Sequence, residues 1–206
     1  PEAVISRGRL VAEKGRLVEP FPPVDWERYF PKASFSKRDW RAREELFRIP
    51  APSGTSASFP VIELANPAIT RIKWVDLASR DGYLDFDASR YLIVAVIGRD
   101  GDWITTGLLE GFANGIEALA SSYNTAAQIL VIGRDARSMS AAVNRVLEMK
   151  GGIVIFDGND PFFELALPIG GVMSEKALPE LAGKERELQS ILFSKGYPYH
   201  DPMYTL

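Results

Sequence analysis

Runs of apolar residues, and the polar breaks between them, predict a sheet with helices packed against it. The most apolar run is 91–97 (YLIVAVI), whose length and β-branched content are typical of a buried strand. A second such strand is predicted at 129–132 (ILVI), and 69–77 (ITRIKWVDL) alternates as a half-buried strand does. Some strands are joined by turns and others through helices. The pattern therefore predicts an α/β (α+β) fold, a mixed β-sheet with packed helices.

Two helices are predicted in the second half of the chain. The first lies between Asp135 and Lys150, with Asp135 as its N-cap and Gly151 in the left-handed position after its end. Its apolar face consists of Met139, Val143, Val146 and Leu147. The second helix opens near Pro179, which suits a first helical turn, and ends before Gly196. Its buried stripe consists of Leu181, Leu188, Ile191 and Leu192.

A hairpin is predicted between these helices. It consists of strands at 153–156 and 162–167 joined by the turn 157–160 (DGND). The two carboxylates of the turn lack the spacing of a calcium-binding loop, which favours a plain hairpin turn.

The pattern divides the chain into three parts. Residues 1–20 predict short strands broken at Arg7-Gly8 and Lys14-Gly15, too small a meander to be stable unless it packs on another sheet. Residues 21–59 are rich in proline and mixed charge and predict a linker with a short helix. The main domain is predicted over 60–206.

Composition limits the chemistry. The 206 residues carry 24 basic and 27 acidic side chains, a net charge of −3, which gives no reason to expect nucleic acid as a partner. No run approaches the roughly 20 apolar residues of a membrane span, and the first residues lack the apolar stretch of a signal peptide, so we expect a cytoplasmic protein without a membrane partner. With no cysteine and one histidine, the chain cannot supply thiolates or a set of imidazoles. We therefore expect no metal ligands and no catalytic residues in it.

One polar segment is a candidate binding site. Residues 121–128 (SSYNTAAQ) lie between predicted strands at 116–120 and 129–132, so their side chains are expected to gather at a sheet end, where ligands often bind. The alternative is a hydrogen-bonded connection without a ligand. The candidate residues near a substrate are Ser121, Ser122, Asn124, Thr125 and Gln128.

Two further features have a functional and a structural interpretation. His200 could act as a general base beside Asp201, but adjacent side chains seldom face each other, which favours a surface or packing role. Gly107, Gly111 and Gly115 match no phosphate-binding motif, which favours close backbone packing.

Several strings resemble the C-terminal domain of adenine deaminases, members of the amidohydrolase superfamily. They are Ala141 to Arg145 (AAVNR), Gly151-Gly152 before a β-run, and Leu167 to Ser174 (LPIGGVMS), in the family's order. Gly107 to Phe112 is similar to the family's G-x-V-K-G-F segment. Arg7 to Val18 resembles part of the β-sandwich that flanks amidohydrolase barrels, so 1–20 would be a remnant of that sandwich.

The resemblance implies a hydrolase that converts adenine to hypoxanthine and ammonia with divalent metals (manganese, iron or zinc). The family's metal ligands lie mostly in a TIM barrel of ~250 residues, which cannot be contained in this chain. We therefore expect a C-terminal fragment of a longer enzyme, as its start at Pro1 and unfinished tail suggest. Its expected partners are its own N-terminal barrel domain, further copies in a homo-oligomer, and a small purine substrate.

One departure from the family indicates a divergent subgroup. Where many adenine deaminases read H-D-S-H-N, this chain reads Asn124 to Gln128 (NTAAQ), without imidazole or carboxylate. Two alternatives to adenine deamination stay open. One is a structural or oligomerisation module without catalysis, and the other is an amidohydrolase acting on another cyclic amide or amidine.

Overall fold

Two units make up the chain, Pro1–Pro31 and Lys32–Leu206. The computed structural model describes residues 1–20, 22–29, 35–51, 54, 56–158 and 160–206. The division falls at residue 31, whereas the sequence pattern places boundaries at residues 20 and 59. The interpretation of 1–20 as part of a sandwich beside a barrel stays a prediction, as does that of 21–59 as a linker.

The first unit is a small antiparallel sheet followed by one helical turn. Its elements are β1 (Ala3–Ser6), β2 (Arg9–Glu13), β3 (Arg16–Leu17) and α1 (Trp26–Tyr29). The hairpin turns are Arg7-Gly8, with φ of 51° and 77°, and Lys14-Gly15, with φ of 50° and 76°. Two successive positive φ angles are the geometry of type I′ turns, whose twist matches that of the flanking strands. The predicted breaks at these two dipeptides are confirmed.

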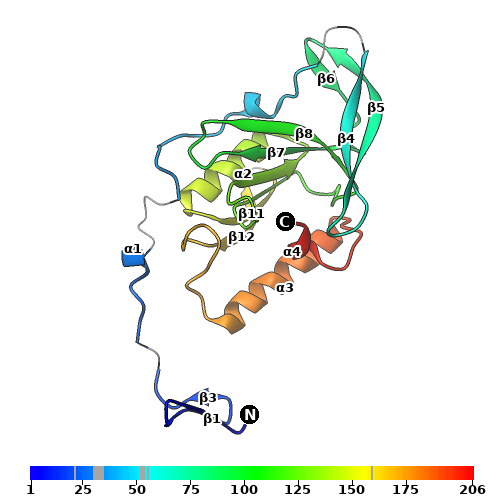
Figure 1. Ribbon diagram of the computed structural model, residues 1–206. Coiled ribbons are helices and arrows are strands. Elements are labelled where there is room, and N and C mark those ends of the chain that lie inside the picture. Colours follow the sequence, from blue (N-terminus) through cyan, green and yellow to red (C-terminus); the bar gives the residue numbers. More distant parts are fainter. Residues whose placement is uncertain (21, 30–34, 52–53, 55, 159) are drawn as a thin grey trace. The chain divides into compact units, whose positions relative to one another are not determined.

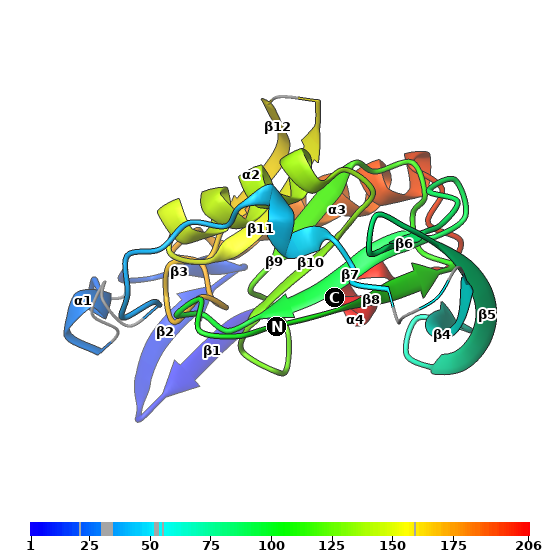
Figure 2. The ribbon, with the colours of Figure 1, turned by 90° about the horizontal axis from the view of Figure 1, so that it is seen from above.

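A nine-stranded mixed sheet organises the second unit (Figure 1). Its strands are β4 (Ser56–Leu64), β5 (Thr70–Arg80), β6 (Tyr83–Asp85), β7 (Leu92–Ile97), β8 (Ile104–Glu110), β9 (Ala118–Ser121), β10 (Ile129–Gly133), β11 (Gly152–Asp157) and β12 (Asp160–Ala166). Their order is β12-β11-β9-β10-β7-β8-β4-β5-β6. All neighbours are antiparallel except β4 and β8. Figure 2 shows β4 and β5 curling away at one end of the sheet.

Each face of this sheet supports a separate core. Because side chains alternate along a strand, β7 sends Ile93, Ala95 and Ile97 to one core and Leu92 to the other. The first core is covered by α2 (Ala136–Glu148) and by the 3-10 helix η2 (Glu44–Phe47). The second is covered by α3 (Leu178–Ser194) together with the C-terminal segment, which contains α4 (Pro202–Thr205). The α-β-α layering agrees with the predicted mixed sheet with packed helices, and no closed barrel is present among the described residues (Figures 1 and 2).

The predicted helices and hairpin strands are confirmed with one correction, while Asn159 of the predicted turn lies outside the described residues. Asp135 caps α2, its Oδ2 accepting from the Ser138 N–H at 2.7 Å. The left-handed residue directly after the C-cap is Lys150, with φ of 61°, and not Gly151, which follows with φ of 112°. Gly151 is required for another reason: a β-carbon there would lie 2.4 Å from Gly171 Cα. Here tertiary packing outweighs the local preference for glycine after a helix.

Other sequence expectations have definite places in the structure. Gly111 and Gly115 confirm close backbone packing, because a β-carbon would lie 3.0 Å from Leu64 O and 2.7 Å from Lys195 O, respectively. Gly107 has no such neighbour. His200 is exposed, and Asp201 caps α4 by accepting from the Tyr204 N–H at 3.2 Å.

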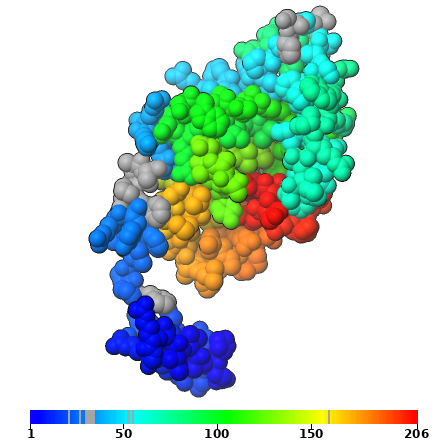
Figure 3. Space-filling model, in the orientation of Figure 1, coloured from blue at the N-terminus to red at the C-terminus, as the bar shows by residue number. Residues whose placement is uncertain are grey.

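The C-terminal segment lies against the β4–β5 hairpin. Tyr199 Oη donates to Leu64 O at 2.5 Å, and Thr205 Oγ1 donates to Pro67 O at 2.9 Å. In the space-filling view the end of the chain (red) borders these strands (cyan to turquoise) (Figure 3). Within the described residues, no helix combines the length and apolar character needed to cross a membrane.

Candidate functional site

The polar segment 121–128 connects β9 to β10 at one end of the sheet. Ser121 is the last residue of β9, and both Ser121 and Ser122 are fully buried. The same sheet end receives the start of β11 and a tight turn at 169–173. The expected gathering of polar residues at a sheet end is therefore present.

Ser122 joins three segments with one hydroxyl. Its Oγ accepts from the Gly152 N–H at 2.8 Å and donates to Gly171 O at 2.5 Å. Its own N–H donates to Gly152 O at 2.9 Å. These bonds satisfy buried backbone groups of β11 and of the 169–173 turn, so the hydroxyl is fully engaged within the fold.

Three other candidate residues also bond to nearby backbone. Ser121 Oγ accepts from the Tyr123 N–H at 3.1 Å. Asn124 Nδ2 donates to Gln128 O at 2.9 Å, which closes the loop. Gln128 Oε1 accepts from the Arg99 N–H at 3.0 Å and ties the loop to the end of β7. Thr125 is exposed, and its side chain makes no hydrogen bond among the described residues.

A shallow pocket of about 540 Å³ lies beside this loop. It is lined by Tyr123, Asn124, Thr125, Val172 and the C-terminal residues 203–206. These described residues offer hydroxyls, one carboxamide and apolar surface, with no carboxylate, imidazole or amine side chain. Such a lining can contact a small ligand but carries no side chain that titrates near neutral pH. Asn124 and Thr125 thus border the pocket, whereas Ser121, Ser122 and Gln128 do not.

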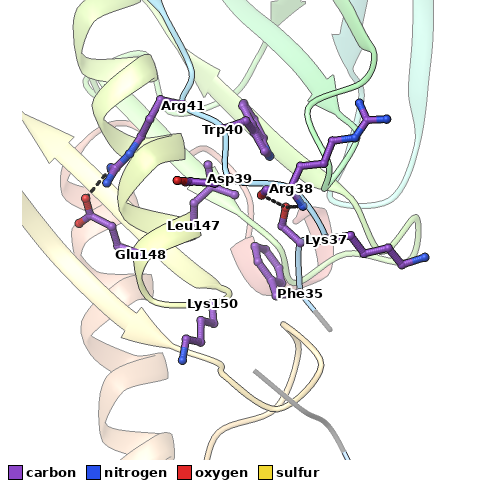
Figure 4. Close-up of a pocket in the computed structure, with 10 residues that line it drawn as sticks. Phe35, Lys37, Arg38, Asp39, Trp40, Arg41, Leu147, Glu148 and Lys150 are labelled. Carbon is purple, nitrogen blue, oxygen red and sulfur yellow. Dashed lines mark hydrogen bonds and ion pairs between the residues drawn. The ribbon is translucent and has the colours of Figure 1, made fainter. Parts of the chain in front are cut away.

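A basic pocket of about 370 Å³ lies near the C-terminal end of α2 (Figure 4). Arg41 pairs with Glu148 at 2.6 Å, and the hydrogen bond holds the pKa of Glu148 below its ordinary value. Lys37 and Arg38 are exposed beside it. The charged segment therefore forms a solvated surface with local ion pairs, as its mixed composition predicts.

The residue that sequence reasoning missed is Arg99. It follows β7 by two positions, where the sequence RDGD indicates only a turn. Its guanidinium lies 4.9 Å from the centre of the Phe35 ring, and its Nη1 donates to Gly170 O at 2.9 Å. Burial lowers the pKa of this guanidinium. An arginine two positions after the most apolar strand is the one available signal in the sequence.

The divalent metals that the family resemblance implies find no site here. Among the residues that the structure describes, no three His, Cys, Asp or Glu side chains come together as a possible ion site. The donor set does not fit such a metal, so no step of a reaction is assigned to one on this chain.

Comparison with known proteins decides the family. The sequence model of the protein family "Adenine deaminase C-terminal domain" matches residues 67–206 of this chain. This chain belongs to that family. A Bacillus anthracis protein named "Putative adenine deaminase" is 30% identical over 208 residues, covering 100% of this chain and 34% of the relative. An adenine deaminase of Ruegeria sp. (strain TM1040) is 30% identical over 194 residues, covering 91% of this chain and 32% of the relative.

The family domain therefore constitutes most of the second unit. A third relative, an adenine deaminase of Paracoccus denitrificans, is 29% identical over 187 residues, which cover 88% of this chain and 30% of the relative. The chain spans about a third of the length of these curated relatives. The pocket beside the 121–128 loop lies wholly within the matched domain.

Proposed function

We propose that this chain is the C-terminal part of a hydrolase that converts adenine and water to hypoxanthine and ammonia. The observation that carries the proposal is the match of the adenine deaminase C-terminal domain to residues 67–206. Relatives named adenine deaminase that align with most of the chain support it.

The chemical step is proposed to lie in the part of the relatives that this chain does not span. Hydrolytic deamination needs an activated water and a group that transfers protons to the leaving ammonia. The described residues bring together no possible metal ligands, and the pocket beside 121–128 lacks a group that titrates near neutral pH. An N-terminal barrel domain with a divalent metal (manganese, iron or zinc) would supply both functions.

The contribution proposed for this chain is to cover that barrel, to form contacts between subunits of a homo-oligomer, and to border the purine. Tyr123, Asn124 and Thr125 are the residues proposed to face the substrate, because they line the open pocket while Ser121 and Ser122 are buried. The enzyme is proposed to act in the cytoplasm.

A second candidate function is the hydrolysis of another cyclic amide or amidine. It is favoured by Asn124 to Gln128 (NTAAQ), which stands where many adenine deaminases are expected to read H-D-S-H-N. Carboxamide and hydroxyl groups recognise a ligand through hydrogen bonds but do not transfer protons at neutral pH as imidazole does.

The test uses the complete polypeptide that the gene encodes, loaded with manganese, iron or zinc. Adenine and a panel of cyclic amides and amidines are supplied separately, and ammonia and the organic product are measured. Hypoxanthine formation from adenine supports the first proposal. Turnover of another member of the panel without turnover of adenine supports the second. No turnover with metal bound favours a structural or oligomerisation module and rejects both.

A further inference from the structure

The guanidinium of Arg99 is half-buried and forms no ion pair with a carboxylate among the described residues. Its Nη1 donates to Gly170 O at 2.9 Å, and its Cζ lies 4.9 Å from the centre of the Phe35 ring. The Nε atom is buried and has no hydrogen-bond partner. Burying a guanidinium is costly unless it is paired with an anion, so this arrangement is incomplete by itself.

Three other arginines of the second unit are paired with carboxylates, whereas Arg134, like Arg99, is in no ion pair among the described residues. Arg41 pairs with Glu148, Arg90 with Glu110, and Arg145 with Glu164. None of the ion pairs among the described residues includes Arg99, and burial lowers the pKa of its guanidinium.

The surroundings hold the guanidinium in a fixed place. A β-carbon on Gly171 would lie 2.7 Å from the Phe35 ring and 3.2 Å from Arg99 Nη2, so only glycine leaves room for both side chains. Gly171 is in turn held by the Ser122 hydroxyl at 2.5 Å. The Arg99 N–H is fixed by Gln128 at 3.0 Å. The arginine is therefore positioned by the same loop and turn that form the candidate site.

We propose that Arg99 binds a planar oxyanion, a carboxylate, which the described residues of this chain do not supply. With Nη1 directed to Gly170 O and Nε enclosed, the Nη2 edge is the part that receives it. A guanidinium suits a carboxylate, because its N–H groups form charge-assisted hydrogen bonds to carboxylate oxygens. The carboxylate comes either from a free small anion or from an Asp or Glu elsewhere in the complete polypeptide.

The experiment compares Arg99→Gln and Arg99→Lys with the wild type in the complete gene product. Arg134→Gln is the matched control, because Arg134 is also partly buried, lies at the opposite sheet end and donates from Nε to Ile116 O at 3.1 Å. Melting temperatures are measured with sodium acetate or inorganic phosphate at constant ionic strength, and separately at low and high sodium chloride.

If the source is a free anion, acetate raises the melting temperature of the wild type and Arg134→Gln by about 1–3 °C and leaves Arg99→Gln unchanged. A comparable rise with phosphate extends the ligand to other oxyanions. If the source is an internal carboxylate, acetate has no effect. Arg99→Gln then melts about 2 °C or more below Arg134→Gln at low salt, and the gap narrows at high salt because ions screen the pair. Because Arg99→Lys keeps the positive charge, its melting temperature should lie between those of the wild type and Arg99→Gln.

The proposal is overturned if acetate and phosphate shift no melting temperature and Arg99→Gln equals the control or exceeds it. It is equally overturned if Arg99→Gln loses stability by the same amount at low and high salt without an anion effect. That result would mean that only packing on Phe35 was lost.

Discussion

At the scale of single residues, one buried hydroxyl holds the candidate site together. Ser122 Oγ bridges the Gly152 N–H and Gly171 O, two backbone groups that are 19 positions apart in the sequence and meet at one sheet end. Sequence reasoning selected Ser122 as a residue near the substrate. The structure shows that its hydrogen bonds are directed inward, and its proximity to a substrate stays a prediction.

Ser122→Ala is expected to destabilise the fold by about 1–3 kcal/mol, because it leaves a buried N–H and a buried carbonyl without this partner. Thr125→Ala is the control in the same loop, because the Thr125 side chain is exposed and makes no hydrogen bond among the described residues. Its unfolding free energy should stay within about 0.5 kcal/mol of the wild-type value. Urea unfolding measures both. Equal stability of the two variants would contradict the bridging role.

Two glycines are expected to respond to alanine with opposite signs. Gly171 has φ of 82° and its β-carbon would lie 2.7 Å from Phe35, so Gly171→Ala should destabilise by about 1–3 kcal/mol. Gly183 lies within α3 with no atom near its β-carbon position, so Gly183→Ala should stabilise by about 0.5–1 kcal/mol. Thermal unfolding of both variants is the measurement. A stabilising Gly171→Ala would show that the packing of Phe35 and Arg99 there is loose.

At the scale of elements, local signals were enough for the second half of the chain. The Asp135 cap, the Asp157-Gly158 turn and Pro179 each act within a few residues, so α2, the β11–β12 hairpin and α3 follow from the sequence. The sheet order does not. The insertion of β9 between β11 and β10, and the parallel pairing of β4 with β8, depend on contacts between distant segments.

The packing of α2 on the β11–β12 hairpin should depend on pH. Arg145 binds Glu164 with two bonds, of 2.5 and 3.0 Å, and this hydrogen bonding lowers the pKa of Glu164 from its ordinary 4.5. The pair therefore contributes stability above about pH 4.5, and that stability is lost as the pH falls through the lower folded pKa. Because both side chains are partly exposed, the contribution should be only about 0.5–1 kcal/mol.

The measurement is the unfolding free energy of wild type and Glu164→Gln from pH 7 down to the acid range. The unfolding free energies of wild type and Glu164→Gln should differ at pH 7 and become equal as the pH falls below about 4.5. Glu175→Gln, which removes an exposed carboxylate without an ion pair among the described residues, should show no such convergence. A gap that stays constant with pH would contradict the assigned cause.

At the scale of the whole molecule, composition and family strings each led to a prediction that does not depend on knowing the fold. One histidine and no cysteine predict that the chain holds no hydrolytic metal centre, which stays a prediction, and the family strings predict the adenine deaminase C-terminal domain. The family is confirmed. The role proposed for Arg99 could not be predicted, because its lack of an ion pair among the described residues is a property of three-dimensional packing.

The central claim is that the chemical step takes place in the part of the complete polypeptide that this chain does not span. Its most direct test is ammonia release from adenine by the purified 206-residue chain and by the complete gene product, each incubated with manganese, iron or zinc. We predict ammonia from the complete product and, from the chain alone, no more than from a blank without protein. Release of ammonia at an enzymatic rate by the chain alone would contradict the claim.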